Sequence, residues 1–376
     1  MVANSGEKHY EGPYDWLKDC EEKSCMVKIC IKNVLLILLV LLPVSAVGEM
    51  SSTYYYSKQP YGSEAFYNPV NLSVSYFLDT VQLSQNFDTS DFDNRWDTVM
   101  HNLGNPAGAI KEEGGAKRFI NRQIFPIDRE HSNESFAIIP NYFLHLLGGG
   151  MVYRKDAEYF KAHGYRYPRL SAAGIAMTAE ILQEVVEKKS TTADDEVADV
   201  FIFRPIGLLL FSNDRIAGFV ADNLQPAIWP YMNMYDINEK KIMNAGINYV
   251  LRPRGLSWEN VRFFSFIGLN NLLGFSHRTG NESWLSWGAG MATEKIDLDL
   301  DIAAELRTSA GLFYEKNNSL LWSVIYNGTE ELKLRINIYP LQLKPFNHVG
   351  FYSGLSNDNT FSAGIMFNFP VGAGSS

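Results

Sequence analysis

The alternation of hydrophobic and polar residues differs between the two ends of this chain. From about residue 241 onward, apolar and polar residues alternate with a period of two between turn residues, and helical periodicity is not seen. The clearest example is ELKLRINIY, in which Leu332, Leu334, Ile336 and Ile338 share one face of an extended chain. The pattern predicts strands over residues 242–252, 261–269, 284–293, 296–315, 319–327, 331–339, 346–354 and 361–369.

The number of predicted strands depends on one long segment. Residues 296–315 alternate without interruption, and at about 3.3 Å per residue they would extend over roughly 65 Å. Taken unbroken, the segment gives about eight strands in all. Broken by a turn or bulge near Ala303 and Ala304 it gives nine, and residues 70–76 would supply a tenth. Asn327-Gly328 favours a tight hairpin turn, since these residue types tolerate positive φ.

The preceding part of the chain has a different pattern. It begins with a polar and aromatic stretch, which predicts an irregular arm with short strand and helix pieces. Helical periodicity follows over residues 141–163 and 170–189, and Pro168 stands where the first turn of a helix accepts proline. The chain therefore predicts an α+β protein with an irregular arm at 49–140, a helical domain at 141–240 and a β domain at 241–376.

The most hydrophobic run lies near the N-terminus. Residues 34–48 have a charge-free core of about 12 to 15 residues, closer to a secretory signal than to the roughly 20 residues of a spanning helix. The small residues Ala46 and Gly48 predict a signal peptide over residues 1–48, cleaved after Gly48. Met26 starts a shorter, basic stretch and is the expected true start. A retained anchor helix is the alternative.

The composition indicates the kind of cellular compartment and limits the kinds of partner. All the cysteines, Cys20, Cys25 and Cys30, precede the predicted cleavage point, so the mature chain would hold no thiol, which suits an oxidising compartment. The chain is 46% hydrophobic, which is too apolar for a disordered protein. After the predicted cleavage point the chain contains 28 basic and 36 acidic residues. The basic residues are not gathered into a block, so no nucleic-acid partner is predicted.

The alternation does not by itself say whether the apolar face packs inward or faces lipid. In a membrane barrel the apolar face points outward, and aromatic residues gather near the strand ends at the bilayer interfaces. Aromatic residues lie near the predicted strand ends at Trp258, Trp284, Trp287, Tyr314, Trp322, Tyr326, Tyr339, Phe351 and Phe369. This placement predicts an antiparallel transmembrane β-barrel.

The last predicted strand, FSAGIMFNF, resembles the C-terminal signal strand of bacterial outer-membrane β-barrel proteins. The residues that carry the resemblance are Ser362, Gly364, Phe367 and Phe369. It implies recognition by the barrel-assembly machinery and location in the outer membrane of a diderm bacterium, in contact with phospholipid or lipopolysaccharide, with the helical domain facing the periplasm. The tail PVGAGSS departs from the pattern, because many such proteins end at the aromatic residue.

Polar residues in the helical domain form a candidate cluster of His145, Glu180, Glu184, Asp199 and Arg204. The run of Glu180, Gln183, an Asp and then Gly207 resembles the helical core of VanZ-like and related uncharacterised envelope proteins. The simpler interpretation is that these carboxylates cap helices and pair with arginines. A metal site is possible in residue type but lacks a diagnostic spacing, so no metal and no cofactor are predicted.

Two pairs of Ser and His residues are the candidates for an enzymatic role. Ser276 precedes His277, and His348 precedes Ser353 by five residues, so in a strand each pair would point to opposite faces. We therefore expect a structural or interaction role in the envelope and assign no catalytic residue. A lipid-modifying acyl hydrolase, or a barrel that binds a lipid or small ligand, is the alternative.

Overall fold

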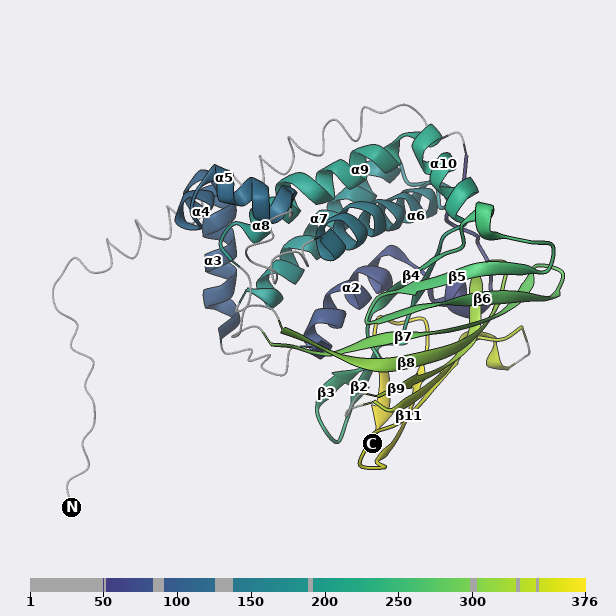
Figure 1. The fold of residues 1–376 in the computed structure, drawn as a ribbon. Helices are drawn as coiled ribbons and strands as arrows, with labels where there is room; N and C mark the ends of the chain where they lie inside the picture. The colour runs from purple at the N-terminus through teal and green to yellow at the C-terminus, as the bar shows by residue number, and fades with distance from the viewer. Residues whose placement is uncertain are drawn as a thin grey trace, which may run out of the picture.

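The computed structural model describes residues 50, 52–83, 91–125, 138–188, 192–297, 303–328, 332–342 and 345–376. The predicted signal peptide, the start at Met26 and all the cysteines lie outside these residues. The described chain is α+β, with helices stacked on one side and a curled sheet on the other (Figure 1).

The helical part contains a series of mostly short elements. Their bounds are η1 Gly62–Phe66, α2 Pro69–Leu83, α3 Phe92–Gly104, α4 Pro106–Glu112, α5 Ala116–Phe119, η3 Ile120–Ile124, η5 Ile138–Gly148, α6 Gly149–Ala162, α7 Pro168–Glu187, α8 Asp195–Ala198, η6 Asp199–Phe203, α9 Arg204–Ser212 and α10 Asp214–Leu224. The helices predicted at 141–163 and 170–189 correspond to η5 with α6 and to α7. Much of residues 49–140, predicted to be irregular, is helical.

The tenth strand predicted at residues 70–76 is wrong, because this segment lies within α2. Asn68 accepts a hydrogen bond from the backbone of Asn71 (2.9 Å), and Pro69 occupies the first helical position. Both features start a helix. The apolar alternation of this segment suggested a strand. In α2, however, Val70 is exposed while Leu72 and Leu78 are buried.

The C-terminal part forms a 13-stranded sheet within the described residues, where the sequence predicted about eight strands. The strands are β1 Ala227–Pro230, β2 Met234–Asp236, β3 Lys241–Met243, β4 Ile247–Leu251, β5 Val261–Ile267, β6 Asn270–Gly280, β7 Ser283–Asp297, β8 Ala303–Lys316, β9 Ser319–Asn327, β10 Leu334–Ile338, β11 Gly350–Leu355, β12 Phe361–Met366 and β13 Gly372–Ser375. Two short helical turns, η7 Arg254–Leu256 and η8 Phe346–His348, lie between strands.

The strand order is β1-β4-β5-β6-β7-β8-β9-β10-β11-β12-β13-β2-β3. Neighbours are antiparallel except β13 and β2, which are parallel. Only Tyr231, Met232 and Asn233 separate β1 from β2, which stand near opposite ends of this order. Because so short a connection reaches at most about 14 Å, the sheet has to curl until its two ends approach each other. Strand pairing among the described residues does not close it into a barrel.

Several strands differ from their predicted bounds. The long segment at 296–315 is broken, as in the second alternative: β7 ends at Asp297 and β8 begins at Ala303. The prediction missed β6, which pairs with β5 and β7. The last predicted strand stops at Met366 as β12, and the tail that follows forms β13 against it.

The two faces of the sheet carry opposite kinds of side chain. Large apolar residues point outward and are exposed at Leu273, Phe275, Trp287, Met291, Leu306, Leu312, Tyr326, Ile338, Phe361 and Ile365. Polar residues alternate with them and are buried inside the curl at Asn270, Ser276, Ser286, Ser309, Ser323, Asn327, Arg335, Asn337 and Ser362. Over β6 to β12 the outer face is therefore largely apolar, and the inside combines these polar side chains with buried apolar ones such as Leu272, Phe313 and Ile325.

The inside of the curl also holds aromatic rings and a buried ion network. Trp229 of β1 packs with Phe264, Phe266 and Phe313, and the Phe266 and Phe313 ring centroids are 4.7 Å apart. Glu315 lies between two arginines: its carboxylate is 3.1 Å from Arg252 Nη1, and it accepts a hydrogen bond from Arg262.

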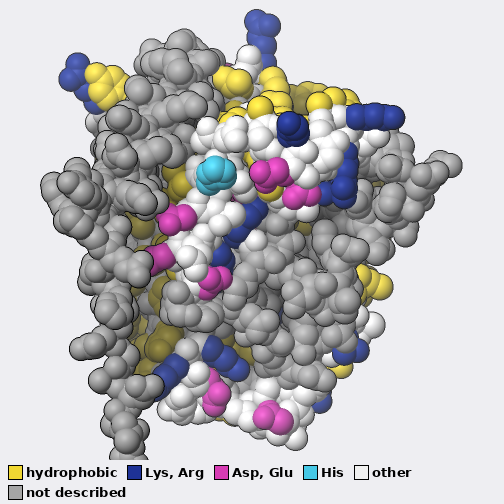
Figure 2. Space-filling view, turned by 90° about the vertical axis from the view of Figure 1, so that its left-hand side faces the viewer, with side chains coloured by type: hydrophobic (Ala, Val, Ile, Leu, Met, Phe, Trp, Pro, Cys, Tyr) yellow, Lys and Arg dark blue, Asp and Glu magenta, His cyan; other side chains and the backbone are white. Residues whose placement is uncertain are grey.

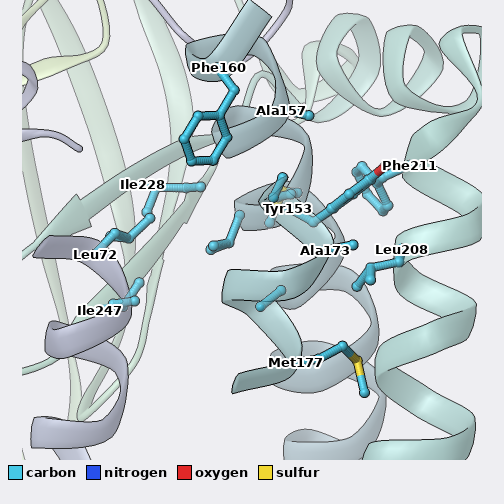
Figure 3. Packing of buried hydrophobic residues seen from close by; sticks show 14 of the residues in the cluster. Leu72, Tyr153, Ala157, Phe160, Ala173, Met177, Leu208, Phe211, Ile228 and Ile247 are labelled. Atoms are coloured by element: carbon cyan, nitrogen blue, oxygen red, sulfur yellow. The ribbon is translucent and has the colours of Figure 1, made fainter. Parts of the chain in front are cut away.

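The main hydrophobic core lies between the helices and the near edge of the sheet (Figure 3). Leu72 of α2, Ile228 of β1 and Ile247 of β4 approach it from one side. The other side is formed by α6, α7 and α9, through residues such as Tyr153, Ala157, Phe160, Ala173, Met177, Leu208 and Phe211. This core joins the two layers, since α2 also contacts β3, β4 and β7.

The segment before α2 ties the helical layer to the sheet. The Glu158 carboxylate on α6 accepts backbone hydrogen bonds from three consecutive residues, Tyr54, Tyr55 and Tyr56, at 2.8–2.9 Å. Farther along, Ser319 of β9 donates its hydroxyl to the Tyr61 carbonyl at 2.7 Å. Fixed at both points, the segment orients α6 relative to β9.

This junction contains a buried acid that makes the stability depend on pH. Tyr67 donates a hydrogen bond to Asp156 Oδ1 (2.6 Å), yet burial raises the pKa of Asp156 from 3.8 to about 7. Between these values the folded state holds a proton that the unfolded state has lost. The free energy of unfolding therefore falls as the pH rises from about 4 to 7, and the loss persists above pH 7.

We expect Asp156→Asn to remove this dependence. The variant should melt several degrees higher than the parent at pH 8 and show little difference at pH 4.5, measured by circular dichroism. Asp222→Asn, at an exposed aspartate on α10, is the matched control and should change neither midpoint. An equal shift of the Asp156→Asn midpoint at both pH values would refute this assignment of the proton.

Candidate polar site in the helical layer

The structure brings the five residues of the predicted polar cluster together inside the helical layer. His145 lies on η5, Glu180 and Glu184 on α7, Asp199 at the start of η6, and Arg204 at the start of α9. All five side chains are buried. Glu180 and Glu184 lie one turn apart and share a face of α7, as the spacing predicts.

Glu180 lies at the centre of the contacts. Its Oε1 is 2.6 Å from His145 Nδ1, and its Oε2 accepts hydrogen bonds from both Arg204 Nε (2.7 Å) and Arg204 Nη2. Tyr76 of α2 donates its hydroxyl to the same oxygen at 3.2 Å. The Arg204 guanidinium also stacks over the Tyr76 ring, 4.9 Å from its centroid. The predicted pairing of a cluster carboxylate with Arg204 is thus present in the structure.

Glycine makes the close approach of these helices possible. A Cβ on Gly149 would clash with the Arg204 guanidinium, and one on Gly207 would meet the Leu146 carbonyl. The neighbouring glycines are as confined, since a Cβ on Gly148 would meet the Tyr249 ring of β4 and one on Gly150 the Phe211 ring of α9.

The second part of the site is formed by acids, and the sequence analysis missed one of them. Glu184, Asp195 and Asp199 each offer a carboxylate oxygen, and these oxygens lie within 4.8 Å of one another. Asp195 is the first residue of α8, four residues before Asp199. That spacing repeats the Glu180 and Glu184 spacing and could have drawn attention to Asp195. What the sequence does not reveal is that the fold brings Asp195, at the start of α8, next to Glu184 of α7.

Three neutral residues complete the surroundings. Gln123 of η3 donates to Asp195 Oδ1 at 3.0 Å. Glu187, one turn beyond Glu184, accepts from Thr80 (2.9 Å) and Gln183 (2.7 Å). None of the three donors carries charge, so none offsets the negative charge of the acids.

The acids fall into two groups by their pKa. Burial alone would raise the pKa of Glu180, but Arg204 and His145 lower it to about 2, so Glu180 is ionised. Burial and the neighbouring Asp199 raise the pKa of Glu184 well above its usual value. Burial likewise raises the pKa of Asp199 and of Asp195. For His145, burial acts to lower the pKa, but Asp199 and Glu180 raise it to about 9, so the imidazole is protonated at neutral pH.

The backbone around the site is unusual. The three π-helical segments in the described part of the chain, η3, η5 and η6, each contribute one residue: Gln123, His145 and Asp199. Insertions of this kind cost backbone stability and occur often at functional sites. Their convergence marks this cluster as the best candidate site in the described chain.

The residues of the predicted assembly signal lie elsewhere. Ser362 and Gly364 are on β12, with Ser362 buried inside the curl. Phe367 and Phe369 are exposed beyond the end of β12, so the prediction that the strand continues to Phe369 is wrong. Pro370 follows, and the backbone donor of Phe369 bonds to the Phe367 carbonyl at 2.7 Å, which turns the chain toward β13.

The members of each Ser and His pair lie on different faces or in different elements. Ser276 is buried on the inner face of β6, where its hydroxyl is 2.7 Å from that of Ser286, and His277 is exposed on the outer face. His348 lies in η8, outside the strand that carries Ser353.

Comparison of the chain with protein-family models, with curated proteins and with solved structures finds no match. The site is therefore interpreted from its own geometry. In the part of the chain described here, no helix has both the length and the hydrophobicity needed to cross a bilayer.

The helical layer nevertheless exposes some apolar side chains. Ile206 and Leu209 of α9 and Phe219 of α10 are exposed. Figure 2 shows hydrophobic side chains along the upper edge of the molecule, above a face where acidic and basic side chains are mixed.

The central ion pair provides a test of the site's structural part. Arg204→Met leaves the ionised Glu180 buried without its strongest partner, so we expect a loss of about 3–5 kcal/mol in the free energy of unfolding. The double variant Arg204→Met/Glu180→Met should recover most of that loss. Urea titration followed by tryptophan fluorescence measures both, with Arg215→Met at an exposed arginine of α10 as the control. Equal losses in the single and double variants would contradict the pairing.

Proposed function

We propose that this protein is an outer-membrane protein of the bacterial envelope with a structural or interaction role. In this proposal the curled sheet lies in the bilayer with its outer face against lipid, and the helical layer lies on the periplasmic side. The observation that carries it is the outer face of the sheet.

That face is continuous across the strands. Phe275 of β6 pairs with Trp287 of β7, Trp287 with Leu312 of β8, Leu312 with Val324 of β9, and Val324 with Ile336 of β10. Directly paired residues have their Cβ atoms about 4.5–5.5 Å apart, so these five side chains form one apolar stripe. An exposed apolar stripe of this extent on a water-facing sheet would drive association, whereas acyl chains would cover it.

The inside of the sheet supports the same proposal. Buried arginine, glutamate, asparagine and serine side chains fill it together with the aromatic rings around Trp229. A soluble sheet places its charges outside and its apolar residues inside, and a membrane sheet with a polar interior reverses this. Because these side chains pack the interior, a wide pore or a ligand-binding barrel is disfavoured. Because Ser276 and His277 point to opposite faces of β6, an acyl hydrolase that uses this pair is also disfavoured.

Edge pairing is the remaining physical requirement. In hydrocarbon each unpaired backbone group costs several kcal/mol, so a sheet in a bilayer has to close or cover its edges. The approach of β1 and β2 through Tyr231–Asn233 brings the two ends of the strand order near each other. In the proposal, the two ends of the strand order close the sheet into a barrel in the bilayer.

Arginine on the apolar stripe tests the proposal. We expect Leu312→Arg and Ile336→Arg to reduce the amount of protein in the outer-membrane fraction severalfold, because arginine at the lipid-facing midplane costs about 2–4 kcal/mol. Immunoblots of fractionated cells, with and without heating before electrophoresis, measure the assembled species. Asn357→Arg, in the exposed turn between β11 and β12, is the matched control and should assemble normally.

A wild-type protein that is water-soluble and monomeric without detergent would refute the proposal. So would arginine variants that fractionate and migrate like the parent.

A further inference from the structure

The acidic part of the candidate site contains carboxylates that lack donors. Both carboxylate oxygens of Glu184 and the Oδ1 of Asp199 have no hydrogen-bond partner among the residues that the structure describes. Glu184 is 1% exposed and Asp199 is 3% exposed, so water does not hydrate them freely. A buried carboxylate without a donor is costly, and the fold would not retain it without a compensating cation or proton.

The nearby basic groups are already engaged by other acids. Arg204 and His145 contact Glu180, Arg122 pairs with Asp194, and Lys188 pairs with Glu196 at 2.8 Å. His145 Nε2 is 3.7 Å from Asp199 Oδ2, but its closer contact, at 2.6 Å, is with Glu180. Glu184, Asp195 and Asp199 therefore bring three carboxylates together with little positive charge left to offset them.

We propose that Glu184, Asp195 and Asp199 bind one divalent cation of the oxygen-preferring class, Mg²⁺, Ca²⁺ or Mn²⁺. Their oxygens lie within 4.8 Å of one another, which is about twice a Ca²⁺–oxygen bond of roughly 2.4 Å. A cation between them reaches all three with small side-chain movements. Carboxylate ligands without thiolate select hard cations.

The surrounding structure suits such a site. Glu184 comes from the 20-residue helix α7, while Asp195 and Asp199 lie four residues apart at the starts of α8 and η6. Gln123 holds Asp195 by a hydrogen bond to Oδ1, which orients a ligand as outer residues do in other metal sites. Asp195 is only half-buried, so the cation enters and exchanges from its side.

Metal binding to the full chain, purified in detergent and stripped with EDTA, tests the proposal. We expect one Mn²⁺ ion to bind per chain, as measured by electron paramagnetic resonance, and excess Mg²⁺ or Ca²⁺ to displace it. Mn²⁺ should also raise the melting temperature of the protein by several degrees. E184Q and D199N should each weaken Mn²⁺ binding at least tenfold. Asp156→Asn alters a buried acid outside the cluster and should bind Mn²⁺ like the parent.

The variants remain informative even where one fails to fold. D195N changes the half-exposed ligand and disturbs packing least, so it should fold and still lose most of the Mn²⁺ affinity. Absence of Mn²⁺ binding to the folded parent at 1 mM would overturn the proposal. Unchanged stoichiometry and affinity in E184Q, D195N and D199N would overturn it equally. The result does not depend on where the sheet lies, because the ligands are all in the helical layer.

Discussion

The compensation of buried charge is the constraint on which the rest of this structure depends. Glu180 between Arg204 and His145, Glu158 against Arg154 and the arm backbone, and Glu315 between two arginines each join segments far apart in the sequence. Removing one partner of such a group leaves a charge that neither water nor protein stabilises. Glu180 therefore fixes α7 against η5 and α9, and Glu315 fixes β8 against β5, beyond what apolar contacts specify.

The helical layer and the sheet place their apolar side chains differently. The helical layer buries them in the core around Tyr153 and Phe211, as a protein in water does. The sheet exposes them along the stripe from Phe275 to Ile336 and buries serine, asparagine and charged residues. One chain with both arrangements fits two surroundings, an aqueous one for the helices and an apolar one for the outer face of the sheet. This contrast supports the membrane proposal more directly than the resemblance of nine C-terminal residues.

Local pattern predicted the parts of the fold that local pattern controls. The alternation around Arg335 placed β10 and showed which of its side chains share a face, and Pro168 marked the start of α7. β6 was missed because Gly274, Ser276 and His277 interrupt its apolar pattern, although neighbouring strands pair on both sides of it. β13 was missed because its glycine-rich sequence has no strand preference of its own and depends on pairing with β12 and β2. For the site, residue type and pattern suggested five members, and one-turn spacing could have added Asp195, but Tyr76 joins through tertiary packing that spacing does not encode.

Glu180 and Glu184 show why the site divides into two parts. They are the same residue type, one turn apart on one helix and equally buried, yet their pKa values shift in opposite directions. The difference is the position of Arg204, which the close approach at Gly149 brings against Glu180 and away from Glu184. Through these contacts Glu180 joins α7 to η5 and α9. The carboxylate of Glu184 is left facing Asp195 and Asp199, where a cation supplies the charge that the arginine does not.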